Sequence, residues 1–402
     1  MFPEDYFNNI SLLAVYGYPH AYNLYNKLSQ NSLNQLFYIS NMNCFVKSTS
    51  YTKNNESFHI GISCNEDELN NCTCTIVNHN IYYSFIFDGS IENKDELIKK
   101  LEDRGMIIQN YSNANLFGLL FLKIKGDINE KIFYLKDVIK GHYNFMIKYE
   151  DKIITGCINN PKKRMKIGKL HTGTIIITDD DEHFSNLDVK FEREFENDET
   201  IFIYDNKLIS NLNDNKINQI CSLNYLYRSN ITSTIGSYKI VDINNTFVSY
   251  LNKSNADIIT HYPTDPLTYA YEYANINKLN FREIAYYHNN HILYIDNYIK
   301  DKIIVVIKEN ISQFHNIIDY IENLYKRGAK EVHLKVLSPM LNYHCHYNMN
   351  EINSNHIQLN ETGIKEYLNL SSLEFLTEEK LMLSIRKFDN NSSICIKCIN
   401  NK

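Results

Sequence analysis

Alternating hydrophobic and polar positions fill much of the first half of the chain and predict β-strands. Residues 81–90 (IYYSFIFDGS) predict a strand that ends at an Asp-Gly turn. Residues 152–178 are rich in short β-type runs. Residues 199–210 (ETIFIYDNKLIS) predict two strands joined by a turn at Asp205 and Asn206. The first half is therefore expected to be rich in β-structure.

Two helices are expected among these strands. Residues 21–28 place Ala, Leu, Tyr and Leu at helical spacing. A second helix should begin after Asn93, which is a suitable N-cap with Glu96 three residues further on, and end near Gly105.

The pattern changes near residues 205–220. Residues 302–307 (KIIVVI) form a continuous apolar run, as in a buried parallel strand. Residues 312–328 are helical, and residues 330–338 alternate again as a strand. One side of that helix carries Ile317, Tyr320, Ile321 and Leu324. A strand, a helix and a strand make a βαβ unit, which predicts a parallel sheet in the second half.

Composition and charge exclude several functional classes. The 402 residues are 44% hydrophobic and 22% charged, as in a globular protein with a core, and the length predicts two or three domains. The net charge is −6 and the densest basic run is KKR at 162–164, so nucleic-acid binding is not favoured. No apolar run approaches about 18 residues, which predicts no membrane span. The amino terminus does not resemble a signal peptide, so a cytoplasmic protein is expected.

Nine cysteines in such a chain indicate thiols or metal ligands more than disulfides. Cys44, Cys64 and Cys157 are expected to be buried as small apolar residues. Cys72 and Cys74 alternate as in a strand. The C-x-x-C pair near the end of the chain, Cys395 and Cys398, has chelating spacing and needs partners elsewhere.

Several segments, in order, resemble amidophosphoribosyltransferase, the glutamine-dependent first enzyme of purine synthesis. They are 12–21 (LLAVYGYPHA), 85–116, 139–170, 221–240 and 325–350, of which the last (YKRGAKEVHLKVLSPMLNYHCHYNMN) is most similar. The resemblance implies an α+β and α/β protein. An Ntn-hydrolase αββα sandwich of the class II glutamine amidotransferases would precede a type I phosphoribosyltransferase domain with a parallel sheet.

The resemblance also implies boundaries for these parts. Residues 1–9 would be an N-terminal extension and residues 10–215 the amidotransferase-like domain. Residues 216–340 would be the phosphoribosyltransferase-like domain. Residues 341–402 would form a C-terminal segment, with cysteine ligands, that packs on the preceding domains.

The glutaminase positions implied by the resemblance have lost their chemistry. The family's nucleophilic cysteine falls on Ile10, which cannot attack an amide. The oxyanion-binding Asn falls on Asp88, beside Gly89, where a carboxylate would oppose the oxyanion. The acid that binds the substrate's α-amino group falls on Asn113, and no arginine precedes Arg104. The glutaminase site is therefore expected to be dismantled.

The phosphoribosyltransferase positions have changed too. The family's VVMVDDSIVRGTT corresponds to IVVIKENISQFHN at 304–316. Its two acids and its serine are replaced by Lys308, Glu309 and Asn310. Phe314 stands where a glycine must approach a phosphate. The family's pyrophosphate-side PDS corresponds to PTD at 263–265, and the lid over the substrate is expected to be shortened or lost around 286–295.

Four cysteines match positions that hold a [4Fe–4S] cluster in some family members: Cys221, Cys345, Cys395 and Cys398. Four thiolates suit an iron–sulfur cluster or a tetrahedral zinc ion, and the preference for [4Fe–4S] rests on the resemblance alone. His344 and His346, beside Cys345, could assist zinc. The alternative is an empty set of inherited thiols.

These observations predict a catalytically inactive family member, a pseudoenzyme that acts as a scaffold, structural component or regulatory partner. Neither phosphoribosyl pyrophosphate nor Mg²⁺ is expected to bind. One alternative is residual amidophosphoribosyltransferase activity in purine biosynthesis, and another is a sensor based on the iron–sulfur or zinc site. A homo-oligomer, dimer or tetramer, and an unidentified protein partner are expected, with no nucleic acid and no membrane as partner.

Overall fold

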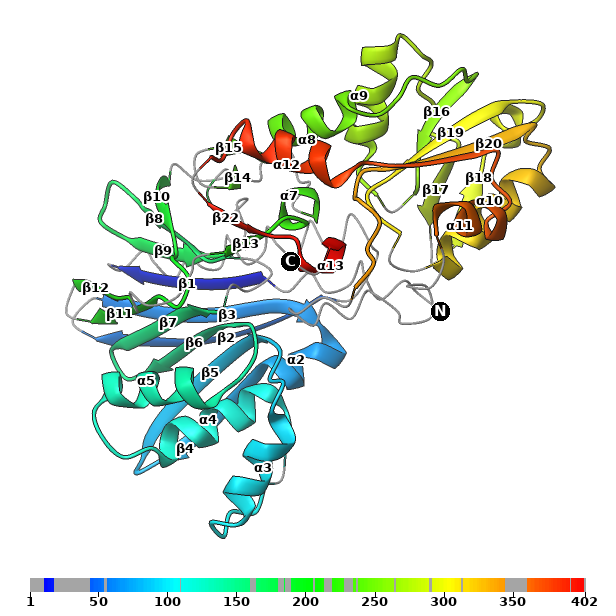
Figure 1. The fold of residues 1–402 in the computed structure, drawn as a ribbon. Helices are drawn as coiled ribbons and strands as arrows, with labels where there is room; N and C mark the ends of the chain where they lie inside the picture. The colour runs from blue at the N-terminus through cyan, green and yellow to red at the C-terminus, as the bar shows by residue number, and fades with distance from the viewer. Residues whose placement is uncertain are drawn as a thin grey trace. The chain divides into compact units, whose positions relative to one another are not determined.

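The protein is described by a computed structural model in which the chain forms two compact units (Figure 1). The amino-terminal unit is Phe7–Gln219, and the carboxy-terminal unit is Ile220–Lys402 with Met1–Tyr6. The structure describes residues 11–17, 44–53, 56–108, 110–159, 164–179, 184, 189–204, 207–212, 219–227, 234–235, 238–263, 265–288, 291–311, 314–343, 360–390 and 392–400.

Two antiparallel sheets form the amino-terminal unit. The first has the strand order β10-β8-β9-β1-β3-β2. Its strands are β1 (Ser11–Gly17), β2 (Cys44–Lys53), β3 (Glu56–Asn65), β8 (Lys166–Lys169), β9 (Ile175–Thr178) and β10 (Lys190–Glu194). The second has the order β12-β11-β7-β6-β5-β4. Its strands are β4 (Thr73–Asn78), β5 (Ile81–Gly89), β6 (Tyr143–Tyr149), β7 (Lys152–Ile158), β11 (Thr200–Tyr204) and β12 (Lys207–Asn211). The strands predicted within 81–90, 152–178 and 199–210 are confirmed.

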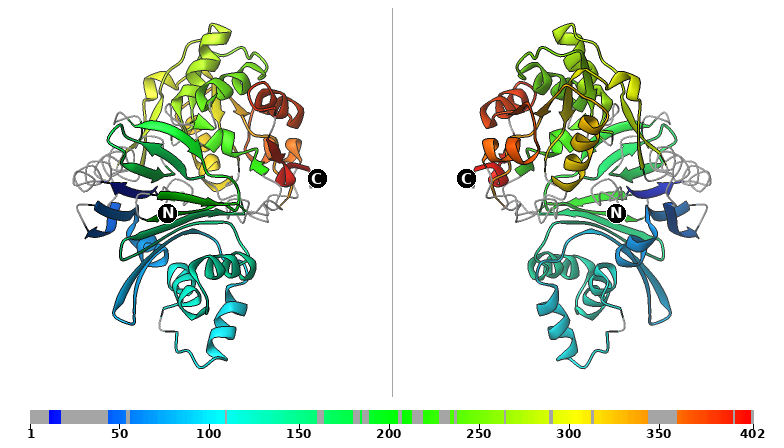
Figure 2. Two further views of the ribbon diagram at one scale, coloured as in Figure 1. Left: turned by 90° about the vertical axis from the view of Figure 1, so that its left-hand side faces the viewer. Right: turned by 90° about the vertical axis from the view of Figure 1, so that its right-hand side faces the viewer.

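Both faces of the second sheet are buried, because β6 is covered along its whole length. Ile86 and Met146 belong to a core cluster that also contains Leu12 and Ile60 of the first sheet. Phe85 and its neighbours on the opposite face pack against helix α4. The ribbon views show α4 and α5 lying along that face of the sheet (Figures 1 and 2). The helices of this unit are α2 (Glu66–Cys72), α3 (Lys94–Glu102), α4 (Asn113–Lys123) and α5 (Ile128–Val138). The helix predicted at 21–28 lies outside the described residues.

Helix α3 begins after Asn93 as predicted, but the predicted capping by the Asn93 side chain is wrong. The Asn93 amide donates to the Val138 carbonyl and accepts from the Lys140 N–H, each at 3.0 Å. This side chain therefore ties the start of α3 to the chain that follows α5.

A four-stranded parallel sheet of order β16-β19-β20-β21 organises the carboxy-terminal unit. Its strands are β16 (Ile258–His261), β19 (Ile303–Lys308), β20 (Glu331–Val336) and β21 (Ser372–Phe375). Helix α10 (Phe314–Lys326) connects β19 to β20, which confirms the predicted βαβ unit. The four apolar residues predicted on one side of this helix are all buried against the sheet: Ile317, Tyr320, Ile321 and Leu324.

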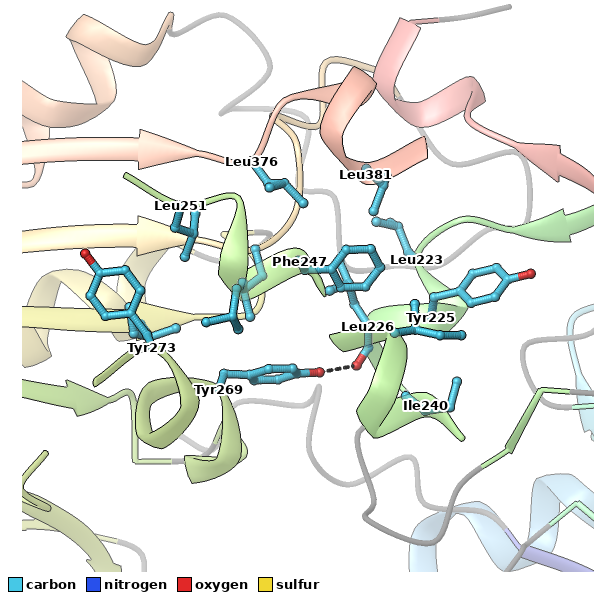
Figure 3. Close-up of a cluster of buried hydrophobic side chains, with 14 of the residues drawn as sticks. Leu223, Tyr225, Leu226, Ile240, Phe247, Leu251, Tyr269, Tyr273, Leu376 and Leu381 are labelled. Atoms are coloured by element: carbon cyan, nitrogen blue, oxygen red, sulfur yellow. Dashed lines mark hydrogen bonds between the residues drawn. The ribbon is translucent and has the colours of Figure 1, made fainter. Parts of the chain in front are cut away.

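Other helices of this unit enclose a second buried cluster, shown in Figure 3. Helix α11 (Glu361–Tyr367) contributes instead to the core around α10, and η2 (Asp296–Tyr298) lies shortly before β19. The helices that contribute to the second cluster are α7 (Asn224–Tyr227), α8 (Ile240–Ser249), α9 (Leu267–Asn277), α12 (Glu378–Arg386) and α13 (Lys397–Asn400). Within the cluster, the Tyr269 hydroxyl donates to the Leu226 carbonyl at 2.9 Å, which satisfies a polar group in an apolar setting (Figure 3). Cys221 and Cys398 belong to the same cluster.

Three two-stranded sheets complete the unit. They are β13 (Gln219–Cys221) with β22 (Ser393–Cys395), β14 (Thr234–Ile235) with β15 (Tyr238–Lys239), and β17 (Ala285–His288) with β18 (His291–Tyr294). Among the described residues, no helix combines the length and the apolar character that a membrane span requires.

Candidate functional site

The carboxyl ends of β16 and β19 lie side by side in the parallel sheet, with His261 opposite Ile307. This edge is where open α/β sheets bind ligands. The chain beyond β16 contributes Tyr262 and Asp265, and the last residue of β19 is Lys308, followed by Glu309. The predicted positions at 263–265 and 308–310 therefore meet at one edge of the sheet.

An ion pair occupies this edge. The Lys308 ammonium lies 3.2 Å and 3.4 Å from the two carboxylate oxygens of Asp265. The Glu309 backbone N–H donates to the same carboxylate at 2.8 Å. The Lys308 side chain is 12% exposed and that of Asp265 is 6% exposed, so most of the water around both charges has been removed.

Aromatic rings complete the surroundings of Lys308. Its ammonium lies 4.0 Å from the centre of the Tyr262 ring, a cation–π distance. The Tyr262 ring makes an edge contact with Tyr320, with ring centres 5.3 Å apart. Burial raises the pKa of the Tyr262 hydroxyl, so this side chain stays neutral. The Lys308 charge is thus satisfied by Asp265 and Tyr262 within the protein.

The region expected to lack a full lid is the β17–β18 hairpin. Strand β17 ends at His288 and β18 begins at His291, which leaves two residues for the connection. Tyr294 in β18 stacks on Tyr320 with ring centres 5.9 Å apart. The described strands thus account for most of 286–295. Asn310 is partly exposed, and Phe314 is the first residue of α10, with its side chain outside the described atoms.

In the amino-terminal unit, the structure brings Gly89 and Asn113 together. Asp88 and Gly89 are the last two residues of β5, and Asn113 is the first residue of α4. The Asn113 side-chain amide donates to the Gly89 carbonyl at 3.2 Å. The resemblance placed Asp88, Gly89 and Asn113 in one site, and their elements do meet there. Ile10 lies outside the described residues.

Asp88 begins a row of polar residues that runs across the second sheet. It pairs with Asn144 of β6, which pairs in turn with Cys157 of β7. The Cys157 thiol donates to the Asn144 side-chain oxygen at 2.9 Å, and neither residue is exposed. Burial raises the pKa of Cys157, so the thiol is not activated as a nucleophile. The prediction that Cys157 is buried is confirmed, whereas Asn144 was not identified from the sequence.

The backbone brings together the segments that carry the predicted cysteine ligands. Cys221 and Cys395 end the paired strands β13 and β22, and the Ser222 N–H donates to the Cys395 carbonyl at 3.0 Å. The Cys398 carbonyl accepts from the N–H of Tyr343 at 3.0 Å. Cys345 follows Tyr343 by two residues and lies outside the described residues.

All three described cysteines are buried: Cys221, Cys395 and Cys398. In the part of the chain that the structure describes, no three His, Cys, Asp or Glu side chains converge as metal ligands. The described residues therefore show that the backbone segments carrying these cysteines lie close together, but they do not form a complete set of metal ligands.

Known proteins that are similar in sequence match most of the length of this chain. No family model matches it. The amidophosphoribosyltransferase of Bacillus subtilis is 24% identical over 348 residues, covering 78% of this chain and 72% of the relative. That of Methanocaldococcus jannaschii is 22% identical over 361 residues, covering 78% and 75%. The chain is homologous to the amidophosphoribosyltransferases.

Solved structures support the same fold for this amidophosphoribosyltransferase homologue. The B. subtilis glutamine phosphoribosylpyrophosphate amidotransferase, solved with ADP and GMP, has a TM-score of 0.82 at 17% identity, covering 98% of this chain and 96% of that one. A structure described as the allosteric regulatory enzyme of purine biosynthesis has a TM-score of 0.83, also at 17% identity, covering 98% and 95%. The expected fold, an Ntn-type amidotransferase followed by a phosphoribosyltransferase with a parallel sheet, is confirmed.

The sequence singled out residues that the fold brings close together in each unit, but it did not reveal the contacts between them. It did not identify the pairing of Lys308 with Asp265 or the ring of Tyr262 beside them. A lysine in place of an acid at the end of a buried strand, with an Asp after the neighbouring strand, is the signal that could have suggested the ion pair. Asn144, a polar residue in the mostly hydrophobic strand β6, is the corresponding signal in the first half.

Proposed function

We propose that this chain is a catalytically inactive amidophosphoribosyltransferase homologue that serves as a scaffold, structural component or regulatory partner. The observation that carries the proposal is the buried ion pair between Lys308 and Asp265 at the ligand-binding edge of the parallel sheet. The resemblance places ribose-binding and pyrophosphate-side groups at these two positions, and here their charges neutralise each other.

The ion pair opposes binding of a Mg²⁺-phosphate ligand. Mg²⁺ prefers carboxylate and phosphate oxygens, but the Asp265 carboxylate already accepts from Lys308 and from the Glu309 N–H. An ion bound there would stand beside the Lys308 ammonium. At about 4 Å and an effective dielectric constant of about 20, two unit charges interact by about 4 kcal/mol, so the repulsion between the ion and Lys308 would cancel most of its attraction to Asp265. Breaking the buried pair to make room would add a further penalty.

The glutaminase half supports the same proposal. Asp88 would put a carboxylate at the position that must stabilise an oxyanion, beside Gly89. The sequence has Ile10 where the family has its nucleophile. Cys157, the described thiol in the row that begins at Asp88, is fully buried and neutral, so it supplies no replacement.

Calorimetric titration with phosphoribosyl pyrophosphate and Mg²⁺ tests the proposal. We expect no saturable heat from this chain, while the B. subtilis relative, measured in parallel, binds. Saturable binding that disappears in an Asp265→Ala variant would instead show that this edge still holds the substrate, and the alternative of residual transferase activity would replace the proposal.

We further propose a structural metal site formed by Cys221, Cys345, Cys395 and Cys398. The three described thiols are buried, and backbone hydrogen bonds hold Cys395 beside Ser222 and Cys398 beside Tyr343. Four thiolates would hold a [4Fe–4S] cluster, with zinc as the alternative. Such a metal would join three distant segments of the chain and so stabilise the folded body. We propose self-association and a protein partner for the assembled form.

Metal analysis after anaerobic purification tests the four-cysteine site. A [4Fe–4S] cluster predicts about four iron atoms per chain and a brown chromophore, whereas zinc predicts about one ion per chain. The Cys395→Ser/Cys398→Ser variant should lose the metal. The Cys72→Ser/Cys74→Ser variant is the matched control, because the Cys74 thiol donates to the Ala114 carbonyl, and it should keep the metal. Wild-type protein without iron or zinc would refute the site.

A further inference from the structure

The tip of the β17–β18 hairpin presents two histidines to each other. The strands pair in the register Tyr286 with Leu293, Tyr287 with Ile292, and His288 with His291 (Figure 1 shows β17 and β18). Directly opposite residues in an antiparallel pair project from the same face, with Cβ atoms about 4.5–5.5 Å apart. His288 and His291 are therefore neighbours on one face of the hairpin.

That face is open to solvent. His288 and His291 are exposed, and the next pair on the same face, Tyr286 and Leu293, is 43% and 40% exposed. The described contacts of the opposite face hold the hairpin on the body of the unit: Ala285 is buried, and Tyr294 lies in the adjoining core. The two imidazoles are thus accessible but stand on a backbone that is already fixed.

Several contacts of Tyr294 strengthen this anchoring. Its ring stacks on Tyr320, and the Arg327 guanidinium lies 4.4 Å from its ring centre. Arg327 in turn bonds Asp296 at 2.5 Å. A ligand pair on an anchored hairpin loses less conformational freedom on binding than a pair on a free loop, which favours chelation.

We propose that His288 and His291 together bind one divalent transition-metal ion. Imidazole nitrogens suit Zn²⁺, Ni²⁺ and Cu²⁺, with metal–nitrogen distances of about 2.0–2.1 Å. Two nitrogens bound to one such ion stand about 3 Å apart, which side chains from directly opposite positions can reach. The remaining coordination positions would hold water, since no third described His, Cys, Asp or Glu completes a ligand group there.

This site is separate from the four-cysteine site in position and chemistry. It lies on an exposed hairpin and uses nitrogen ligands, whereas the cysteine segments are buried and offer sulfur. It also does not depend on the proposed loss of catalysis, because neither histidine belongs to the ion pair at the sheet edge. The two proposals can therefore fail independently.

Titration of the full-length protein with Ni²⁺ at pH 8, followed by calorimetry, tests the site. Wild type, His288→Gln, His291→Gln and the double variant are compared, with His171→Gln as a control at an exposed histidine elsewhere. Circular dichroism establishes that each variant is folded. If both imidazoles bind one ion, each single variant loses about tenfold or more in affinity, and the double variant binds hardly more weakly than either single variant.

Independent surface histidines would behave differently. Each single substitution would then remove one weak binding event and leave the other, and the double variant would lose both. That additive pattern, or a titration that neither substitution changes, would overturn the proposal. An unchanged titration of His171→Gln, together with a double variant that binds hardly more weakly than either single variant, would establish the pair as the ligand.

Discussion

Replacing Asp265 with alanine removes the acceptor of two donor groups at once, the Lys308 ammonium and the Glu309 N–H. The Lys308 ammonium, in a side chain that is only 12% exposed, loses its partner at 3.2 Å, and the Glu309 N–H loses its acceptor at 2.8 Å. Truncating one partner of a buried ion pair costs about 3–5 kcal/mol. Lys308→Met removes the cation but leaves Asp265 its bond from Glu309, so a smaller loss of about 2–3 kcal/mol is expected.

The double variant separates the ion pair from the rest of the site. Once Asp265 has been removed, Lys308 is an unpaired charge, and replacing it with Met relieves that cost. The two losses should therefore be far from additive, with a coupling of about 1–3 kcal/mol. The exposed i,i+4 pair Glu322–Lys326, whose side chains are 55% and 66% exposed, is the matched control. Glu322→Ala should cost about 0.5 kcal/mol or less.

Urea unfolding measures these differences. The sequence contains no tryptophan, so far-ultraviolet circular dichroism follows the transition. Because the chain has two units, the transition assigned to the carboxy-terminal unit is the one to compare. The reasoning would be wrong if Asp265→Ala lowered the free energy of unfolding no more than Glu322→Ala does, and if the effects of Asp265→Ala and Lys308→Met were additive. The ion pair would then not be a fixed part of the site.

Two further predictions concern the amino-terminal unit. Burial and the nearby Lys148 lower the pKa of His59 to about 4 from 6.5. Because the unfolded chain binds the proton first, stability should fall by about 3 kcal/mol as the pH drops from 6.5 to 4. Urea unfolding across this pH range should show a smaller loss of stability in His59→Gln than in wild type, and an unchanged loss in His171→Gln. Equal losses in the two variants would contradict the assignment of the pH dependence to His59. Gly89 has a φ of 136°, and a Cβ there would collide with the His142 carbonyl, so Gly89→Ala should lower stability by at least about 1–3 kcal/mol. A melting temperature unchanged from wild type would refute that expectation.

Periodicity was sufficient to predict much of the architecture. The apolar run at 302–307 and the helix with Ile317 and Leu324 on its inner side follow directly from spacing, because burial on both faces of a parallel sheet leaves few alternatives. The cap at Asn93 was predicted wrongly, since local spacing cannot reveal that its side chain bonds residues 138 and 140.

The interior of the candidate site could not be predicted in the same way. Asp265 and Lys308 are 43 residues apart, and their pairing depends on the parallel register of β16 and β19. The link between Asn113 and the Gly89 carbonyl likewise forms only when α4 packs on β5. Side chains that are distant in sequence become partners through the fold, so residue types alone could show which positions differ from the family but not which contacts these side chains make.

The most direct test of the proposed inactivity is an assay for phosphoribosylamine formation from phosphoribosyl pyrophosphate, Mg²⁺ and ammonia. Ammonia bypasses the glutaminase half, so the assay isolates the sheet edge that holds Lys308 and Asp265. Our account predicts no pyrophosphate release above the uncatalysed rate, under conditions in which the B. subtilis relative turns over. Release that depends on protein concentration and is abolished by Asp265→Ala would show that the edge remains an active site.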